Sequence, residues 1–217
     1  ERRLSLTGTP FRSDASPIRF VDYAPAERGV RLSICDYRYG YGRALRDHVV
    51  RPVVFFAYAG RMRWRTRQGH EMESRLGELD TKDVTSQAWR TALDPAGEWI
   101  QTVLRSADKR LSQVRQAIPD AGGLVIATDQ RAARAYAEVL EEISGETPVI
   151  VLSDEAGSSE RIESFAAGEQ RWLVAVRMVS EGVDVPRLAV GVYATNASTP
   201  LFFAQAIGRF VRARRRG

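Results

Sequence analysis

Three residues near the end of the chain have the types and the spacing to bind a polyphosphate. Gln205 is followed by Gly208-Arg209 and then by Arg212, in the pattern Q-x-x-G-R-x-x-R. A guanidinium group matches two phosphate oxygens in charge and in geometry, whereas a lysine ammonium does not. Two arginines three positions apart on a helix lie on one face of it. The pattern therefore predicts that Arg209 and Arg212 can reach a single polyphosphate.

The positive charge of the chain is concentrated at the same end. Residues 208–217 contain five arginines and no acidic residue, and the formal net charge of the chain is +5. The remainder is therefore close to neutral, and the basic end indicates a local anionic partner, either phosphate or nucleic acid. A solubilising tail is the alternative, and we interpret Arg214, Arg215 and Arg216 as a solvated or phosphate-contacting tail rather than as catalytic residues.

The composition excludes several classes of protein. Hydrophobic residues make up 44% of the 217 residues, which fits a packed globular protein of one large domain or of one domain with part of another. No apolar run approaches the roughly 20 residues of a membrane span, and the first residues contain no signal-peptide core. Cys35 is the single cysteine, and His48 and His70 are distant in sequence, so neither a disulfide framework nor a metal site is expected. We expect a cytoplasmic protein.

Helices and buried strands alternate through the second half of the chain. Helical spacing of apolar residues, short apolar runs, and capping residues such as Thr128 or Asp129 and Gly145 mark the boundaries. We expect helices over residues 98–117, 130–144, 158–167 and 202–212, and strands over 124–127, 149–152, 172–176 and 188–193. This alternation predicts an α/β fold with a parallel sheet flanked by helices. Ligands bind such sheets at the carboxyl ends of the strands, where loops 177–187 and 195–200 should lie.

The first 97 residues are less regular and predict a β-hairpin. Residues 53–58 form an apolar run that is typical of a strand, and arginines at positions 61, 63, 65 and 67 then alternate along one face of a second strand. A turn at residues 68–70 would set Glu71 opposite Arg67 and Glu73 opposite Arg65. We favour this cross-strand pairing, with a nucleic-acid-facing ribbon as the alternative. Residues 74–97 then form a linker with a helical piece.

Three short clusters occur in order along the chain. They are Thr7-Gly8-Thr9-Pro10, then Ser180-Glu181-Gly182-Val183-Asp184, and then the segment that begins at Gln205. In this order and at this spacing they resemble motifs III, V and VI of the superfamily II helicases and translocases, the ATP-driven DEAD/DEAH-type motors with two RecA-like lobes. The resemblance is loose over the whole chain and close over residues 120–217. It implies a RecA-like parallel sheet flanked by helices, preceded by an irregular segment with a β-hairpin.

The resemblance implies coupling and nucleic-acid roles for several residues. Thr7, Gly8 and Thr9 match motif III, where hydroxyl groups couple hydrolysis to lobe movement. Residues 124–128 with the following helix match motif IV, so Thr128 would lie near the nucleic-acid backbone. Ser180 of motif V would contact a phosphate of the strand.

Nucleotide-binding roles follow from the rest of motif V and from motif VI. Gly182 would let the backbone approach closely, Asp184 would bind the nucleotide ribose or a bridging water, and Glu181 belongs to the same set. Arg209 and Arg212, with Gln205, would meet the γ-phosphate of ATP with Mg²⁺ bound mainly by the other lobe. Such an arginine finger can contribute on the order of 10³–10⁵ in rate. Because it comes from a second lobe, hydrolysis would depend on lobe closure.

The chain departs from the family pattern because its sequence contains no phosphate-binding loop. A motor needs the sequence G-x-x-x-x-G-K-[ST] and an acidic motif, yet the only lysines are Lys82 and Lys109 and neither lies in such a loop. We therefore interpret the chain as a fragment that carries the second lobe. Residues 1–50 would be the tail of the first lobe with the interlobe connection, residues 51–97 a strand, hairpin and linker, and residues 98–217 the second lobe. The chain alone should neither hydrolyse ATP nor unwind a duplex.

The nature of the nucleic acid is indicated by residues 44–52, Ala-Leu-Arg-Asp-His-Val-Val-Arg-Pro. They look like the A-[LI]-x-[DE]-G-x-[LV]-x-P element of DNA-directed members, with His48 where glycine is usual. We favour DNA over RNA as the partner, together with the chain's own N-terminal RecA-like lobe and no membrane. The alternative is a non-enzymatic nucleic-acid-binding module that uses the arginines at 61–67 and 209–216 as phosphate contacts. A Rossmann dehydrogenase is excluded because no G-x-G-x-x-G follows a strand.

Overall fold

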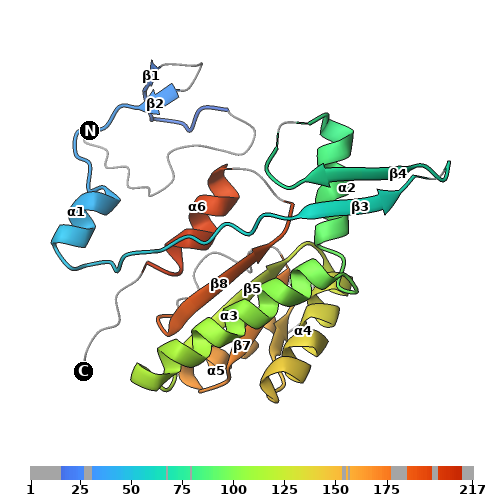
Figure 1. The fold of residues 1–217 in the computed structure, drawn as a ribbon. Coiled ribbons are helices and arrows are strands. Elements are labelled where there is room, and N and C mark those ends of the chain that lie inside the picture. The colour runs from blue at the N-terminus through green and yellow to red at the C-terminus, as the bar shows by residue number, and fades with distance from the viewer. Residues whose placement is uncertain are drawn as a thin grey trace. The chain divides into compact units, whose positions relative to one another are not determined.

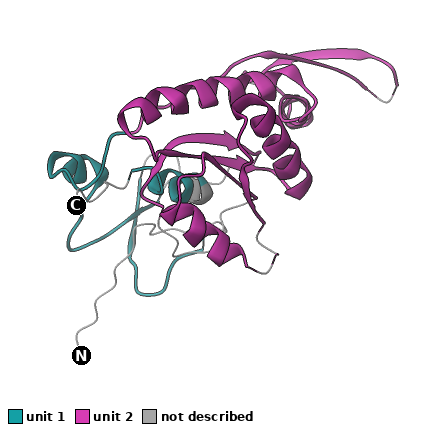
Figure 2. Ribbon diagram, turned by 90° about the horizontal axis from the view of Figure 1, so that it is seen from below, with its two compact units in different colours: residues 1–52, 198–215 teal, residues 53–197, 216–217 magenta. Residues whose placement is uncertain are grey.

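The computed structural model of the chain describes residues 16–26, 31–66, 68–78, 80–152, 155, 157–176, 185–196 and 200–211, with the backbone alone at 200–202. Contacts divide the chain into two compact units (Figure 2). Unit 1 consists of residues 1–52 and 198–215, and unit 2 consists of residues 53–197 with the final two residues. Each unit is described by itself.

Unit 2 is built on a parallel sheet of four strands (Figure 1). The strands are β5 (Gly122–Ala127), β6 (Val149–Val151), β7 (Trp172–Val176) and β8 (Leu188–Ala194). Their spatial order is β6-β7-β5-β8, and each neighbouring pair is parallel. All residues of β5 and β7 are buried, as expected for central strands covered on both faces. The predicted α/β fold with a helix-flanked parallel sheet is confirmed.

Three helices cover the sheet: α3 (Glu98–Ala117), α4 (Gln130–Ser144) and α5 (Ser158–Ala167). Side chains of α3 and α4, among them Leu104 and Tyr136, share one core with Val125, Val174 and Val192 of the strands. The crossover through α5 runs across the sheet in the direction opposite to the crossover through α4, so right-handed connections place α5 on the other face. The predicted bounds of all three helices are confirmed.

The N-terminus of α4 shows how a cap fixes the position of an element. The carboxylate of Asp129 accepts a hydrogen bond from the backbone N–H of Ala132 at 2.8 Å, so Asp129, rather than Thr128, caps the helix. At the other end Gly145 adopts φ 73°, in the left-handed region that glycine enters without a steric penalty. The cap leaves Thr128 between β5 and α4, with its hydroxyl group available for another contact.

A hairpin and a helix form a second, smaller core in unit 2. Strands β3 (Arg61–Arg65) and β4 (Glu71–Arg75) are antiparallel, and α2 (Lys82–Ala92) packs beside them. Their buried side chains include Met62 and Leu76, with Trp99 packed against them. The predicted hairpin is confirmed, but its register is not: Glu71 lies opposite Arg65 and Glu73 lies opposite Arg63. The ladder ends at the pair Arg65 and Glu71, so the connection between the strands is longer than the predicted turn at residues 68–70.

One predicted strand is wrong. Residues 53–58 form no strand, and the side chains of Val54, Phe55 and Phe56 are 73, 61 and 70% exposed. An apolar run becomes a strand only where a neighbouring strand offers a ladder of hydrogen bonds, and the run alone does not show whether that neighbour exists.

The described part of unit 1 contains strands β1 (Tyr23–Pro25) and β2 (Arg31–Ser33), which pair antiparallel, and helices α1 (Tyr41–Arg46) and α6 (Pro200–Gly208). Helix α6 ends at Gly208 and not at residue 212 as predicted. Arg209 therefore lies in the turn that follows the helix. No helix in the described ranges has the length and apolar character required to cross a membrane.

Candidate functional site

The carboxyl edge of the sheet brings three strand ends together. In the register of the sheet, Ala127 at the end of β5 lies beside Val176 of β7 on one side and beside Ala194 of β8 on the other. Thr128 therefore leaves the sheet at its centre, where open α/β sheets bind their ligands. The segment 177–184 that follows β7 lies outside the described residues.

Thr128 connects two of these strand ends. Its hydroxyl group donates a hydrogen bond to the carbonyl oxygen of Ala194 at 3.3 Å, and its side chain is half-buried. A hydroxyl group has one proton and two lone pairs. While Thr128 donates to Ala194 it can accept a hydrogen bond from a ligand but cannot donate one to a phosphate oxygen. A phosphate contact through this hydroxyl would require that bond to be exchanged.

Gln205 and Arg209 lie at the C-terminal end of α6 in unit 1. Gln205 is on the last full turn, Arg209 follows the helix directly, and both side chains are half-buried. The backbone N–H of Arg209 donates to the carbonyl oxygen of Ala206 at 3.2 Å, and that of Phe210 donates to Ile207 at 2.9 Å. These bonds span three residues and tighten the end of the helix into a turn. They fix the backbone from which the Arg209 side chain extends.

Arg51 contacts the chain immediately after Arg209. Its Nε donates to the carbonyl oxygen of Phe210 at 2.8 Å, and its backbone N–H donates to the carbonyl oxygen of Val211 at 2.8 Å. The carbonyl of Arg51 in turn accepts a hydrogen bond from the Tyr41 hydroxyl at 3.2 Å. This arrangement was not predicted, because no pattern in the sequence indicates that residues 159 positions apart are in contact.

His48 has a backbone conformation that suits glycine, the residue that the resemblance leads one to expect at its position. Its φ is 56°, in the left-handed region. The N–H of His48 donates to Leu45 at 3.1 Å, and the N–H of Val49 donates to Ala44 at 2.9 Å. These two bonds are the pair that defines a Schellman motif, whose left-handed residue is usually glycine. The motif ends α1 and directs the chain toward Arg51.

Three of the predicted site residues lie within the described ranges. Thr128, Gln205 and Arg209 are described, with Thr128 in unit 2 and the other two in unit 1. The remainder lie outside the described residues: Thr7, Gly8, Thr9, Ser180, Glu181, Gly182, Asp184 and Arg212.

A buried arginine, Arg187, precedes β8. The guanidinium group of Arg187 donates to three carbonyl oxygens: Phe165 at 2.7 Å, Asp120 at 2.8 Å and Gln170 at 2.7 Å. The carbonyl of Arg187 accepts from the N–H of Gly122 at 2.8 Å. Arg187 therefore ties the entrance of β8 to the start of β5. Its position between Pro186 and Leu188 was the available sequence signal, since an arginine within an apolar run requires buried partners.

An acidic residue on α3 fixes the start of β7. Asp108 accepts hydrogen bonds from Arg171 Nε at 2.7 Å and from Trp172 Nε1 at 2.9 Å, and Arg171 also donates to Ser112. The Trp172 indole lies so close to β5 that a Cβ added at Gly123 would overlap it. The contact is structural: it satisfies the polar atoms of a buried indole and a nearly buried ion pair.

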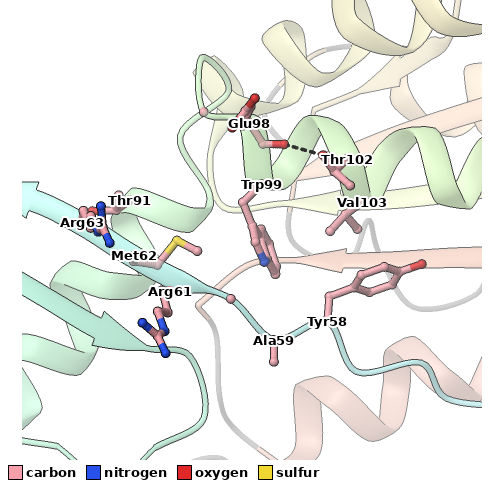
Figure 3. A pocket seen from close by; sticks show the side chains of 12 residues that line it. Tyr58, Ala59, Arg61, Met62, Arg63, Thr91, Glu98, Trp99, Thr102 and Val103 are labelled. Carbon is pink, nitrogen blue, oxygen red and sulfur yellow. Dashed lines mark hydrogen bonds between the residues drawn. The ribbon is translucent and has the colours of Figure 1, made fainter.

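A hollow of about 420 Å³ lies between the start of β3 and the first turn of α3 (Figure 3). Trp99 forms one wall, with Tyr58, Met62 and Val103 nearby. The indole packs edge-to-face against Trp89, with 6.4 Å between the ring centroids, and a Cβ on Gly60 would lie 2.8 Å from the Trp99 ring. Trp99 therefore belongs to the packing of unit 2, and the hollow includes none of the predicted site residues.

Unit 2 is an α/β lobe with a four-stranded parallel sheet, and unit 1 has a glycine-arginine turn at the end of α6. Residues 110–214 match the family described as the helicase conserved C-terminal domain. Over these residues the chain resembles a helicase C-terminal domain, and the predicted likeness to a helicase C-terminal lobe is confirmed for this stretch.

Relatives and solved structures add context. An uncharacterized protein of Mycobacterium tuberculosis is 65% identical over 216 residues, and one of Mycobacterium leprae is 60% identical over 216 residues. Each alignment covers all of this chain and 36% of the relative, so the chain spans about a third of the length of these relatives. The crystal structure of the Pyrococcus furiosus Hef helicase domain is 19% identical, with a TM-score of 0.42 over 61% of this chain and 27% of that one.

Proposed function

We propose that the chain is the C-terminal motor lobe of an ATP-dependent helicase or translocase that acts on DNA. The match of residues 110–214 to the helicase C-terminal domain carries this proposal, because Gln205 and Arg209 fall within the matched stretch. In this proposal a first RecA-like lobe binds ATP with Mg²⁺, and this chain contributes side chains to that nucleotide. RNA is the alternative substrate.

Arg209 is the central residue of the proposed chemistry. Its charge would neutralise the negative charge that develops on the γ-phosphate oxygens during transfer to water, with Arg212 as a second cation and Gln205 beside them. The tight turn after α6 favours this role, because a fixed backbone places a long side chain with less entropy loss. Gly182, Asp184 and Glu181 would contribute nucleotide contacts, and Thr7, Gly8 and Thr9 would couple hydrolysis to movement.

Nucleic-acid contacts are proposed at the carboxyl edge of the sheet. Ser180 and Thr128 would face the phosphates of the strand. Thr128 is supported by its position at the centre of the edge, with the condition that its hydroxyl exchanges the bond to Ala194.

The test is the Arg209→Met substitution in the complete gene product that contains this chain. We expect DNA-stimulated ATP turnover to fall on the order of 10³-fold, while binding of a fluorescent ATP analogue changes by less than about threefold. Arg105→Met is the matched control, since Arg105 is an exposed arginine on α3 that contacts Gln101. Full turnover in the Arg209 variant would contradict the proposed arginine-finger role.

The non-enzymatic nucleic-acid-binding module is distinguished by the same measurements. It predicts salt-dependent DNA binding that ATP does not affect, and no hydrolysis by the complete protein. The hairpin gives this alternative little support, since Arg63 and Arg65 are ion-paired with Glu73 at 2.6 Å and with Glu71 at 2.9 Å. The chain on its own should show no DNA-stimulated ATPase activity, and a measurable rate would contradict its proposed role as a dependent lobe.

A further inference from the structure

Arg51 binds the backbone on the C-terminal side of the proposed finger. The N–H of Arg209 is bonded to α6, and the carbonyl groups of the next two residues, Phe210 and Val211, are bonded to Arg51 at 2.8 Å each. Arg209 is therefore enclosed between two anchored points of the main chain. One anchor is α6, and the other is Arg51, which lies 159 positions before Phe210 in the sequence.

Arg51 is itself positioned from two sides. The Schellman motif centred on His48 ends α1 three residues earlier and fixes the direction in which the chain leaves the helix. The Tyr41 hydroxyl, from the first turn of α1, donates to the carbonyl of Arg51. Pro52 follows and restricts the conformations open to Arg51. Arg51 thus offers its two donors from a preorganised backbone, and its charged Nε forms a stronger bond than a neutral donor would.

We infer that Arg51 is a positioning residue for Arg209: it sets the path of residues 210 and 211 and thereby the direction of the Arg209 side chain. The inference rests on the proposed function of Arg209. Arg51 acts on the backbone and needs no contact with nucleotide. The rate of hydrolysis should therefore depend on Arg51 more strongly than nucleotide affinity does, because a small misplacement of a catalytic group affects the transition state most.

The experiment compares substitutions at position 51 in the complete gene product. Arg51→Met keeps the length of the side chain and the backbone bond to Val211 but removes the donor to Phe210. We expect kcat for DNA-stimulated ATP hydrolysis to fall about 10- to 100-fold, with KM and the affinity for a fluorescent ATP analogue within about threefold. Arg51→Lys restores a charged donor and should recover kcat to within about fivefold of the native value. Arg46→Met, an exposed arginine on α1, removes the same charge and should change neither quantity.

The double variant Arg51→Met with Arg209→Met tests whether Arg51 acts through Arg209. We expect it to be no slower than Arg209→Met alone, since a misdirected side chain matters only while it is present. Losses that multiply would overturn the inference, and so would a native kcat in Arg51→Met or a failure of lysine to rescue. If Arg209→Met keeps full turnover, the proposed function fails first. A loss in Arg209→Met with none in Arg51→Met refutes the positioning role alone.

Discussion

The guanidinium carbon of Arg187 lies 3.8 Å from the centre of the Phe165 ring, and Nε of the same arginine donates to the Phe165 carbonyl oxygen at 2.7 Å. One residue of α5 thus receives both a cation–π contact and a hydrogen bond from the residue that precedes β8. Arg187 is only 3% exposed, and its guanidinium group also donates to the carbonyl oxygens of Asp120 and Gln170. Carbonyl dipoles and a ring face contribute to the stabilisation of its charge.

Loss of the Arg187 guanidinium group should destabilise unit 2. Arg187→Met retains the apolar stem but leaves three carbonyl oxygens without their donor, which we expect to lower the free energy of unfolding by about 2–4 kcal/mol. Urea unfolding followed by tryptophan fluorescence measures this change, because all four tryptophans lie in unit 2.

Two further variants give that experiment its controls. Arg187→Lys should recover less than half of the loss, since one ammonium group cannot reproduce a planar fork directed at three carbonyls. Arg105→Met, at an exposed position, should change the free energy of unfolding by less than about 0.5 kcal/mol. Equal stabilities of the Arg187→Met variant and the native protein would show that desolvation of the charge cancels all of its contacts.

The helices whose pattern is local were predicted most accurately. The spacing of apolar residues and the caps located α3 and α4 to the residue, because a helix satisfies its own backbone hydrogen bonds. The run at 53–58 was misjudged because a strand depends on a partner elsewhere. The end of α6 was misjudged for the same reason, since the bonds from Arg51 to Phe210 and Val211 come from a distant segment.

Alkaline pH should expose the contribution of Tyr136. This side chain is fully buried and its hydroxyl donates to the Leu93 carbonyl at 2.6 Å. Burial, followed by the negative charges of Asp129 and Asp94, raises the pKa of Tyr136 above the ordinary value of 10.0. The folded protein therefore keeps this proton when the unfolded chain loses it. Stability from this group is complete below pH 10 and falls above it, by up to about 1.4 kcal/mol per pH unit.

Tyr136→Phe separates this effect from the loss of a hydrogen bond. At about pH 8 we expect the variant to be less stable than the native protein by about 1–2 kcal/mol. At about pH 11 the difference should shrink below about 0.5 kcal/mol or reverse, because phenylalanine has no proton to lose. Leu140→Ala, one turn further along α4, should have the same cost at both pH values. A Tyr136→Phe cost that is independent of pH would contradict the assignment.

The hairpin arginines should contribute little to nucleic-acid binding. Arg63 and Arg65 are exposed and paired with Glu73 and Glu71, so each of these two guanidinium groups already has a carboxylate partner. In the complete gene product, Arg63→Gln with Arg65→Gln should leave the slope of log affinity against log salt unchanged. A slope whose magnitude falls by about 0.7–0.9 for each arginine removed would contradict this prediction, because that is the change expected for a lost phosphate contact.

The sequence indicated the type of site, but not the residues that hold its backbone in place. The residue types and order of the motifs resembled those of a helicase lobe, and guanidinium groups suit phosphate binding. Arg51 and Arg187 were missed for a physical reason: each donates to main-chain carbonyl groups, which every residue possesses. A contact with a carbonyl therefore leaves no signature in the partner's residue type.

The left-handed backbone at His48 should cost stability that glycine would recover. His48→Gly and His48→Ala both remove the imidazole, but only alanine retains a Cβ at φ 56°. We expect the glycine variant to be more stable locally than the alanine variant by about 1 kcal/mol, the usual cost of a Cβ in this region. Hydrogen exchange of the Val49 amide, which donates to Ala44, measures this directly and should be about fivefold slower in the glycine variant. Equal exchange rates would show that the Cβ is accommodated at this φ without strain.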